Sequence, residues 1–167
     1  MTEFIYRAVN ENGTRALGKA LAASLPETAL VALNGPLGAG KTRLVQAVAE
    51  ALGIDPSLVT SPTFVLIHEY ASRVSLFHFD LYRIRDEDEF LTLGPEEYFT
   101  RPGWIFIEWA ERVAEFLPRD RLNITITANQ PTAREFLIQS HGSIHQQVIT
   151  SLRENIGRWP TADALQR

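Results

Sequence analysis

The segment from Gly35 to Thr42 constrains the fold of this 167-residue chain more than any other. Its sequence, Gly-Pro-Leu-Gly-Ala-Gly-Lys-Thr, fits the pattern G-x-x-x-x-G-K-[ST]. A short apolar run, Ala29–Leu33, leads directly into it. Apolar residues at helical spacing follow it, namely Leu44, Val45, Val48, Ala49 and Leu52. A strand, a glycine-rich loop and a helix in this order predict a phosphate-binding P-loop.

The chemistry of such a loop assigns a role to each part of it. Glycines allow backbone N–H groups to turn inward around an anion, and the following helix directs its N-terminal dipole at the same anion. We therefore expect Lys41 to bridge the β- and γ-phosphates of a nucleotide and Thr42 to hold Mg²⁺. The chain has neither D-x-x-G after the loop nor N-K-x-D, the signals of GTPases, so ATP is the expected nucleotide.

Composition is that of one globular domain. Hydrophobic residues make up 45% of the chain, which is enough for a core at this length. The absence of cysteine excludes disulfides and thiolate metal sites. The first residues lack a basic segment followed by an apolar run, and no stretch approaches the roughly 20 apolar residues of a membrane span, so we expect a cytoplasmic protein without a membrane partner. A net charge of −4 argues against a broad nucleic-acid surface, although a local arginine patch stays open.

The remaining pattern predicts an α/β, P-loop NTPase-like three-layer fold with a mixed central sheet and antiparallel hairpins. Thr14 is expected to cap an amphipathic helix that stops at Pro26. The expected strands are residues 4–9, 29–33, 64–70, 74–80, 104–109, 122–127 and 135–140, with a final helix over 144–156. Residues 1–158 would form a single P-loop ATPase domain, and residues 159–167 a loose C-terminal tail.

Two carboxylates end apolar strands and are candidates for the second half of the site. Asp80 follows Phe77-His78-Phe79, and Glu108 follows Ile105-Phe106-Ile107. Ligands bind at the carboxyl ends of strands in open α/β sheets, so either side chain could hold the metal. His78, between two phenylalanines, is interpreted as a hydrogen-bonded structural histidine rather than a base.

Four motifs in this order resemble the bacterial TsaE (YjeE) family of small ATPases, required for threonylcarbamoyladenosine in tRNA. The motifs are Gly38-Ala39-Gly40-Lys41-Thr42, Ser61-Pro62-Thr63-Phe64, His78-Phe79-Asp80-Leu81-Tyr82-Arg83 and Glu108-Trp109. The resemblance implies a protein that binds ATP and Mg²⁺, hydrolyses ATP slowly, and acts with two partner subunits of the threonylcarbamoyl-transfer assembly. Contact with tRNA would be indirect, through those partners.

The resemblance also implies roles for individual residues. Thr42 and Glu108 would hold Mg²⁺, Asp80 would help to position water or the metal shell, and Lys41 would join these two carboxylates in catalysis. The segment Ser61–Thr63 would be a loop that responds to the γ-phosphate, and Trp109 would report on the nucleotide state. The residues expected to contact the nucleotide are Thr14, beside the adenine, and Gly38, Ala39, Gly40, Lys41, Thr42 and Arg43.

Two positions depart from the family pattern. Pro36 stands where the family usually has an acidic residue, and Arg43 stands where it usually has a second threonine. Proline fixes φ and removes one N–H, but the phosphate cradle depends mainly on later residues of the loop, so nucleotide binding is expected to survive.

Two other functions remain open from the sequence. A small P-loop kinase, acting on a small molecule or nucleotide, would share the same loop but would need an acceptor pocket and an arginine-bearing lid. A nucleotide-dependent interaction module without meaningful turnover would use the same residues as a slow ATPase.

Overall fold

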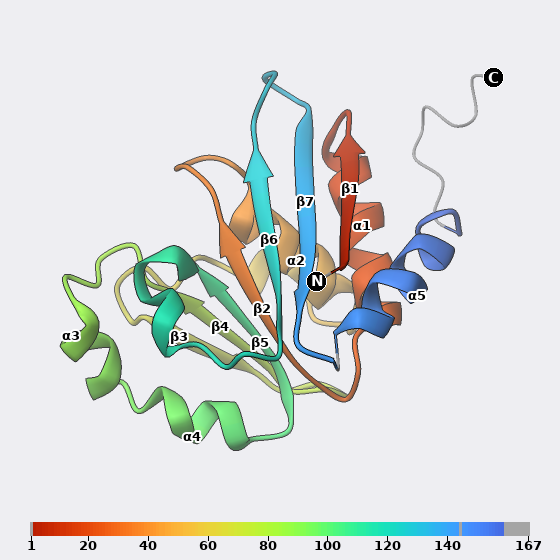
Figure 1. The fold of residues 1–167 in the computed structure, drawn as a ribbon. Coiled ribbons are helices and arrows are strands. Elements are labelled where there is room, and N and C mark those ends of the chain that lie inside the picture. The colour runs from red at the N-terminus through yellow and green to blue at the C-terminus, as the bar shows by residue number, and fades with distance from the viewer. Residues whose placement is uncertain (1, 144, 159–167) are drawn as a thin grey trace.

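The computed structural model describes residues 2–143 and 145–158, and it contains one seven-stranded mixed sheet (Figure 1). The strand order is β1-β7-β6-β2-β5-β4-β3. The strands are β1 (Thr2–Ala8), β2 (Thr28–Asn34), β3 (Ile67–Tyr70), β4 (Leu76–Asp80), β5 (Gly103–Glu108), β6 (Arg121–Thr127) and β7 (Arg134–His141). The helices are α1 (Glu11–Ser24), α2 (Lys41–Ala51), η1 (Pro56–Leu58), α3 (Glu87–Thr92), α4 (Pro95–Thr100), η2 (Ala110–Phe116) and α5 (Gln146–Ile156).

Strand β2 lies at the centre and pairs in parallel with both β5 and β6, while β5 also pairs in parallel with β4. The outer pairs β1–β7, β6–β7 and β3–β4 are antiparallel. The antiparallel hairpins expected in the sheet are therefore present, as β3–β4 and β6–β7. The parallel centre brings the carboxyl ends of β2, β4 and β5 to one edge of the sheet.

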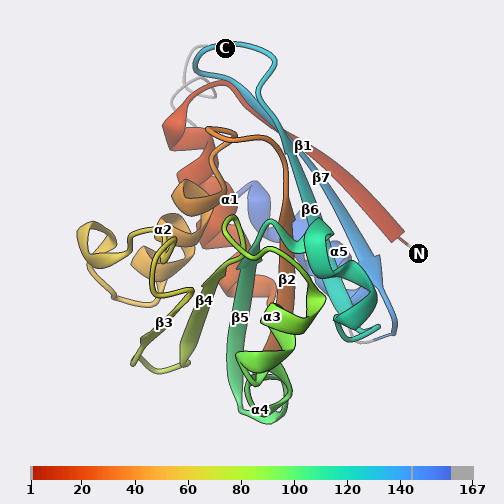
Figure 2. The same ribbon diagram turned by 90° about the vertical axis from the view of Figure 1, so that its left-hand side faces the viewer.

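Helices cover both faces of the sheet, as expected for a three-layer fold (Figures 1 and 2). Side chains alternate along the buried strand β2: Val31 and Leu33 join the core beneath α1, α2 and α5, whereas Leu30 and Ala32 join the core beneath α3, α4 and η2. A strand buried on both faces reads as a continuous apolar run, which is the pattern seen at Ala29–Leu33.

Helices α1 and α2 pack side by side with very little space between them. A Cβ atom at Gly18 of α1 would lie 2.4 Å from the Cβ of Ala47 in α2. That separation is shorter than real Cβ contacts allow, so glycine at position 18 permits this approach. The Arg15–Glu50 ion pair also joins the two helices.

The predicted start of α1 is wrong. Asn10, not Thr14, is the N-cap, and its side chain accepts a hydrogen bond from the Gly13 N–H. Gly13 lies inside the helix, and a Cβ there would lie 2.8 Å from the Cβ of Ala8. Close packing of α1 on β1, not turn geometry, therefore accounts for this glycine.

The C-terminal helix begins at Gln146, and the predicted loose tail over 159–167 lies outside the described residues. Within residues 2–143 and 145–158, no helix combines the length and the apolar character needed to cross a membrane.

Candidate phosphate-binding site

The loop 35–40 leaves the carboxyl end of β2 and enters the first turn of α2, as the sequence predicts. Gly35, Gly38 and Gly40 all have positive φ, at 138°, 77° and 106°. At Gly35 a Cβ would lie 2.5 Å from the carbonyl oxygen of Ile126, so both the backbone angle and the space require glycine. The left-handed Gly40 then starts α2, whose unpaired N–H groups face the loop.

Lys41 is only 4% exposed and is held inside the loop. Its Nζ donates hydrogen bonds to the carbonyl oxygens of Gly35 at 2.6 Å and Pro36 at 3.0 Å. The same ammonium lies 3.8 Å from the centre of the Trp109 ring. Burial lowers the pKa of Lys41, and the negative charges of Glu108, Glu111 and Asp80 act against that shift.

The two strand-ending carboxylates are neighbours, because the parallel register of β4 and β5 places Asp80 opposite Glu108. Glu108 is 3% exposed. Its Oε1 accepts hydrogen bonds from Thr42 Oγ1 at 2.6 Å and is 2.8 Å from His78 Nε2. The fully buried His78 therefore fixes the orientation of Glu108, while its Nδ1 has no hydrogen-bond partner within the described part of the chain.

Asp80 instead holds the segment between η1 and β3. Its Oδ2 accepts hydrogen bonds from the hydroxyls of Ser61 and Thr63, the second at 2.9 Å, and its Oδ1 accepts one from the Tyr82 N–H at 2.9 Å. The hydroxyls of Ser61 and Thr63 are also 2.7 Å apart. The loop that the family resemblance marks as responsive thus rests on a carboxylate at the edge of the sheet.

Among the described residues, two other than glycine have left-handed backbones, and both flank this region. Leu66 has a φ of 68° and Trp109 a φ of 61°. Such angles are costly for side chains of this size and concentrate at functional sites. The Trp109 ring, 5.0 Å from the Tyr82 ring, lies over Lys41 as a result.

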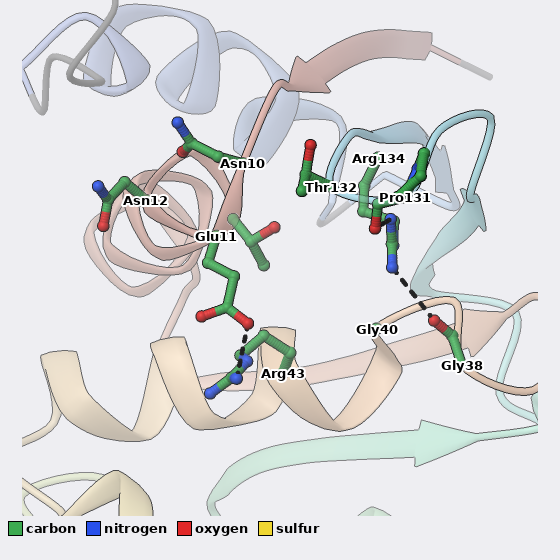
Figure 3. Close-up of a pocket in the computed structure, with 10 residues that line it drawn as sticks. Asn10, Glu11, Asn12, Gly38, Gly40, Arg43, Pro131, Thr132 and Arg134 are labelled. Atoms are coloured by element: carbon green, nitrogen blue, oxygen red, sulfur yellow. Dashed lines mark hydrogen bonds and ion pairs between the residues drawn. The ribbon is translucent and has the colours of Figure 1, made fainter.

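Two adjoining cavities surround the loop. The first, of about 420 Å³, collects most of the predicted site residues. It is lined by Leu37, Gly38, Gly40, Lys41, Thr42, Arg43, Ser61, Thr63, Asp80, Tyr82, Glu108 and Trp109. The second, of about 670 Å³, opens beside it between the start of α1 and the β6–β7 loop, and Thr14, Gly38, Gly40 and Arg43 are among its lining residues (Figure 3). Ala39 does not line either of these cavities: it is 1% exposed, and its N–H donates to the carbonyl of Pro36.

Sequence reasoning missed Arg134, the first residue of β7, which fastens the P-loop from the opposite side (Figure 3). Its Nε donates to the carbonyl of Ala39 at 2.9 Å, and one terminal nitrogen lies 3.4 Å from the carbonyl of Gly38. The other terminal nitrogen donates to the carbonyls of Gln130, Pro131 and Ala133. No motif marks this arginine, since its contacts depend on which strands become neighbours.

Comparison with known proteins identifies the family of the chain. The family model described as "Threonylcarbamoyl adenosine biosynthesis protein TsaE" matches residues 8–136. A Bacillus subtilis protein named tRNA threonylcarbamoyladenosine biosynthesis protein TsaE is 39% identical over 153 residues, covering 91% of this chain and 95% of that protein. The protein of the same name from Treponema pallidum is 39% identical over 114 residues, covering 68% of this chain and 84% of its own.

A solved structure is also similar. The crystal structure of YdiB from Bacillus subtilis superimposes with a TM-score of 0.77 and 33% sequence identity, covering 92% of this chain and 95% of that one. The likeness in fold and sequence thus extends over nearly the whole molecule. Together with the matched family model, it shows that the chain belongs to the TsaE family.

Proposed function

We propose that this protein binds ATP with Mg²⁺, hydrolyses it slowly, and serves the biosynthesis of threonylcarbamoyladenosine in tRNA. It would do so through nucleotide-dependent assembly with two protein subunits that carry out threonylcarbamoyl transfer, and would reach tRNA through them. Membership of the TsaE family supports the pathway, and the composition of the site supports the chemistry.

The observation that carries the proposal is the meeting of three elements in one cavity of about 420 Å³. Lys41 and Thr42 come from α2, Glu108 from β5 and Asp80 from β4. A cation, a hydroxyl and two carboxylates around a glycine-rich loop are the groups that phosphoryl-transfer sites use to hold a triphosphate and its metal.

The side chains present fit a magnesium ion. Thr42 and Glu108 offer hard oxygen ligands that already touch each other. A magnesium ion here would take its other ligands from phosphate oxygens and water. When bound, Mg²⁺ would neutralise charge on the phosphate oxygens.

Three side chains of the protein, Lys41, His78 and Asp80, would have separate roles in the site. Lys41 lies at the cradle with its ammonium directed by two carbonyls, so its charge is positioned before any ligand arrives. His78 restricts Glu108 to one orientation, in the manner of an outer-shell partner. Asp80, joined to Ser61 and Thr63, links the chemistry to the loop that partners would recognise.

The kinase alternative finds less support in the segment that follows Glu108. All residues from 109 to 120 are described, and they form η2 and a turn before β6 begins. Helix η2 is the helical element of that stretch, and its Arg112 donates to the carbonyl of Ile84, so this arginine is already engaged with the protein itself.

The direct test measures ATP affinity by calorimetry and ATP turnover with and without the partner subunits. Lys41→Ala should lose useful affinity for the triphosphate while the fold remains, because the loss falls on charge at the phosphates. Lys19→Ala is the matched control, since Lys19 is the chain's other lysine and lies on α1 away from both cavities. Wild-type affinity in Lys41→Ala would refute the P-loop assignment, and phosphate transfer to a small acceptor would favour a kinase.

A second experiment addresses the responsive loop. Ser61→Ala and Thr63→Ala should leave ATP binding largely unchanged but weaken nucleotide-dependent complex formation, because both hydroxyls anchor the loop on Asp80. Amide hydrogen exchange over residues 58–70 should differ between ADP and a non-hydrolysable ATP analogue. Equal protection in both states, with undiminished partner binding by the two variants, would remove the loop from the proposal.

A further inference from the structure

The cavity of about 670 Å³ contains an ion pair on its helical side. Glu11, the first residue of α1, accepts a hydrogen bond at 2.8 Å from the guanidinium of Arg43 in the first turn of α2 (Figure 3). Another nitrogen of the same guanidinium is 3.2 Å from Gln46 Oε1. Both charged residues line the cavity, and Arg134 lies on its opposite side (Figure 3).

This cavity adjoins the cavity of about 420 Å³ at the P-loop, because Gly38, Gly40 and Arg43 line both of them. A nucleotide with its phosphates in the cradle would bring several negative charges next to Arg43, the residue directly after Thr42. The Glu11 carboxylate is a fixed negative charge in the same cavity. Arg43 therefore has two possible anionic partners, the carboxylate and the ligand.

Whether Arg43 leaves Glu11 for the phosphate depends on the relative strength of these two interactions. The side chains of Arg43 and Glu11 are 53% and 75% exposed, and exposed ion pairs of this kind contribute little to stability. An arginine can hold a phosphate through two parallel charge-assisted hydrogen bonds, which are stronger and more directional. The free energy lost when the Glu11–Arg43 ion pair opens is therefore smaller than the free energy gained when Arg43 binds a phosphate.

We infer that Arg43 leaves Glu11 to bind the nucleotide's phosphate, and that Glu11, by competing for Arg43, lowers the affinity of the site for nucleotide. The inference rests on the proposed function and adds a residue pair that sets how readily the nucleotide is released. A carboxylate that accepted a hydrogen bond from a ribose hydroxyl would raise the affinity for nucleotide, whereas Glu11 is expected to lower it.

The test is a calorimetric titration of the full chain with MgADP and with a magnesium complex of a non-hydrolysable ATP analogue. Glu11→Gln removes the competing charge and should tighten both affinities by about two- to fivefold, the effect expected of an exposed ion pair. Arg43→Gln should weaken both by about tenfold, as loss of a charge-assisted contact does. Arg43→Gln should be at least as damaging in the Glu11→Gln background, where Arg43 has lost its alternative partner.

Glu50→Gln is the matched control. Glu50 pairs with Arg15, so this change also removes one carboxylate from an ion pair between α1 and α2, but neither partner lines the cavity of about 670 Å³. Its affinities should equal those of the wild type. Weaker binding by Glu11→Gln, or equal tightening by Glu11→Gln and Glu50→Gln, would overturn the competition. A wild-type protein that binds neither nucleotide would overturn the proposed function as well, and the two failures are therefore distinguishable.

Discussion

Arg134 offers a test of how the P-loop is held in shape, independent of any ligand. Replacing it by methionine keeps an apolar stem of similar length and removes the guanidinium. The substitution deletes the bonds to Ala39 and Gly38 on the P-loop and those to the β6–β7 loop. Ala39 and Arg134 are 95 residues apart in sequence, and the P-loop and the β6–β7 loop would lose the hydrogen bonds that Arg134 makes to both.

The expected loss in the free energy of unfolding depends on which of these hydrogen bonds are buried. The bonds to Ala39 and Ala133, at 2.9 Å and 2.8 Å, are partly buried, whereas those to Gln130 and Pro131 are exposed and the one to Gly38 is long. A hydrogen bond to a charged group contributes about 1.5–3 kcal/mol. If the bond to Ala39 accounts for most of the effect, the free energy of unfolding should fall by about 2 kcal/mol. In a domain of this size, that lowers Tm by about 4–8 °C.

The assay combines calorimetric melting with amide exchange of residues 38–41, which should become faster in Arg134→Met. Arg7→Met is the control. Arg7 lies opposite Glu135 in the β1–β7 ladder, one position from Arg134. Its side chain is 77% exposed, and its ion pair with Glu135 should contribute almost nothing to stability. A Tm for Arg134→Met that matches that of Arg7→Met, with unchanged exchange in the loop, would show that Arg134 does not hold the P-loop.

Two further predictions concern titratable groups. Glu108→Gln should weaken the Mg²⁺ dependence of nucleotide binding and the hydrolysis rate more than nucleotide affinity itself, since glutamine keeps the shape but loses the charge a hard cation prefers. If Asp80→Asn rather than Glu108→Gln abolishes the dependence in a magnesium titration, the two roles are reversed. His145 is 2% exposed, neither ring nitrogen has a hydrogen-bond partner in the described residues, and burial lowers its pKa against the opposing charge of Asp120. As the pH drops below about 6.5, His145 is therefore protonated in the unfolded chain before it is protonated in the folded protein. The free energy of unfolding should consequently fall as the pH drops below about 6.5. In urea unfolding, His145→Phe should flatten this part of the profile, and an unaltered slope would rule the histidine out as its cause.

Local signals in the sequence were enough to predict the parts of the site that depend on one segment. The pattern from Ala29 to Leu52 predicted a strand, a loop and a helix in the observed order. The apolar runs before Asp80 and Glu108 predicted two strands with carboxylates at their ends. Each of these follows from neighbours in the chain, through side-chain spacing and backbone preference.

Features that depend on which strands become neighbours could not be predicted from the sequence. The contact of His78 with Glu108 requires β4 and β5 to be adjacent, parallel and in one particular register. The start of α1 was mispredicted for a related reason. Threonine is a residue type favoured at N-caps, but α1 starts earlier, at Asn10, where Gly13 lets it pack against Ala8 of β1, a contact that the local pattern does not contain.

The missing side chain at Gly18 has a mechanical consequence. Gly18 lets the backbones of α1 and α2 approach closely, so the helix that carries Thr14 and the helix that follows the P-loop are packed tightly together. The segment from Ser61 to Leu66 is instead joined to Asp80 by a few hydrogen bonds: the carboxylate accepts from the hydroxyls of Ser61 and Thr63, and the Asp80 N–H donates to the carbonyl of Leu66. In the proposed function, an adjustment to the length of the bound phosphate chain would therefore fall on the segment from Ser61 to Leu66, while the closely packed helices α1 and α2 would stay in place.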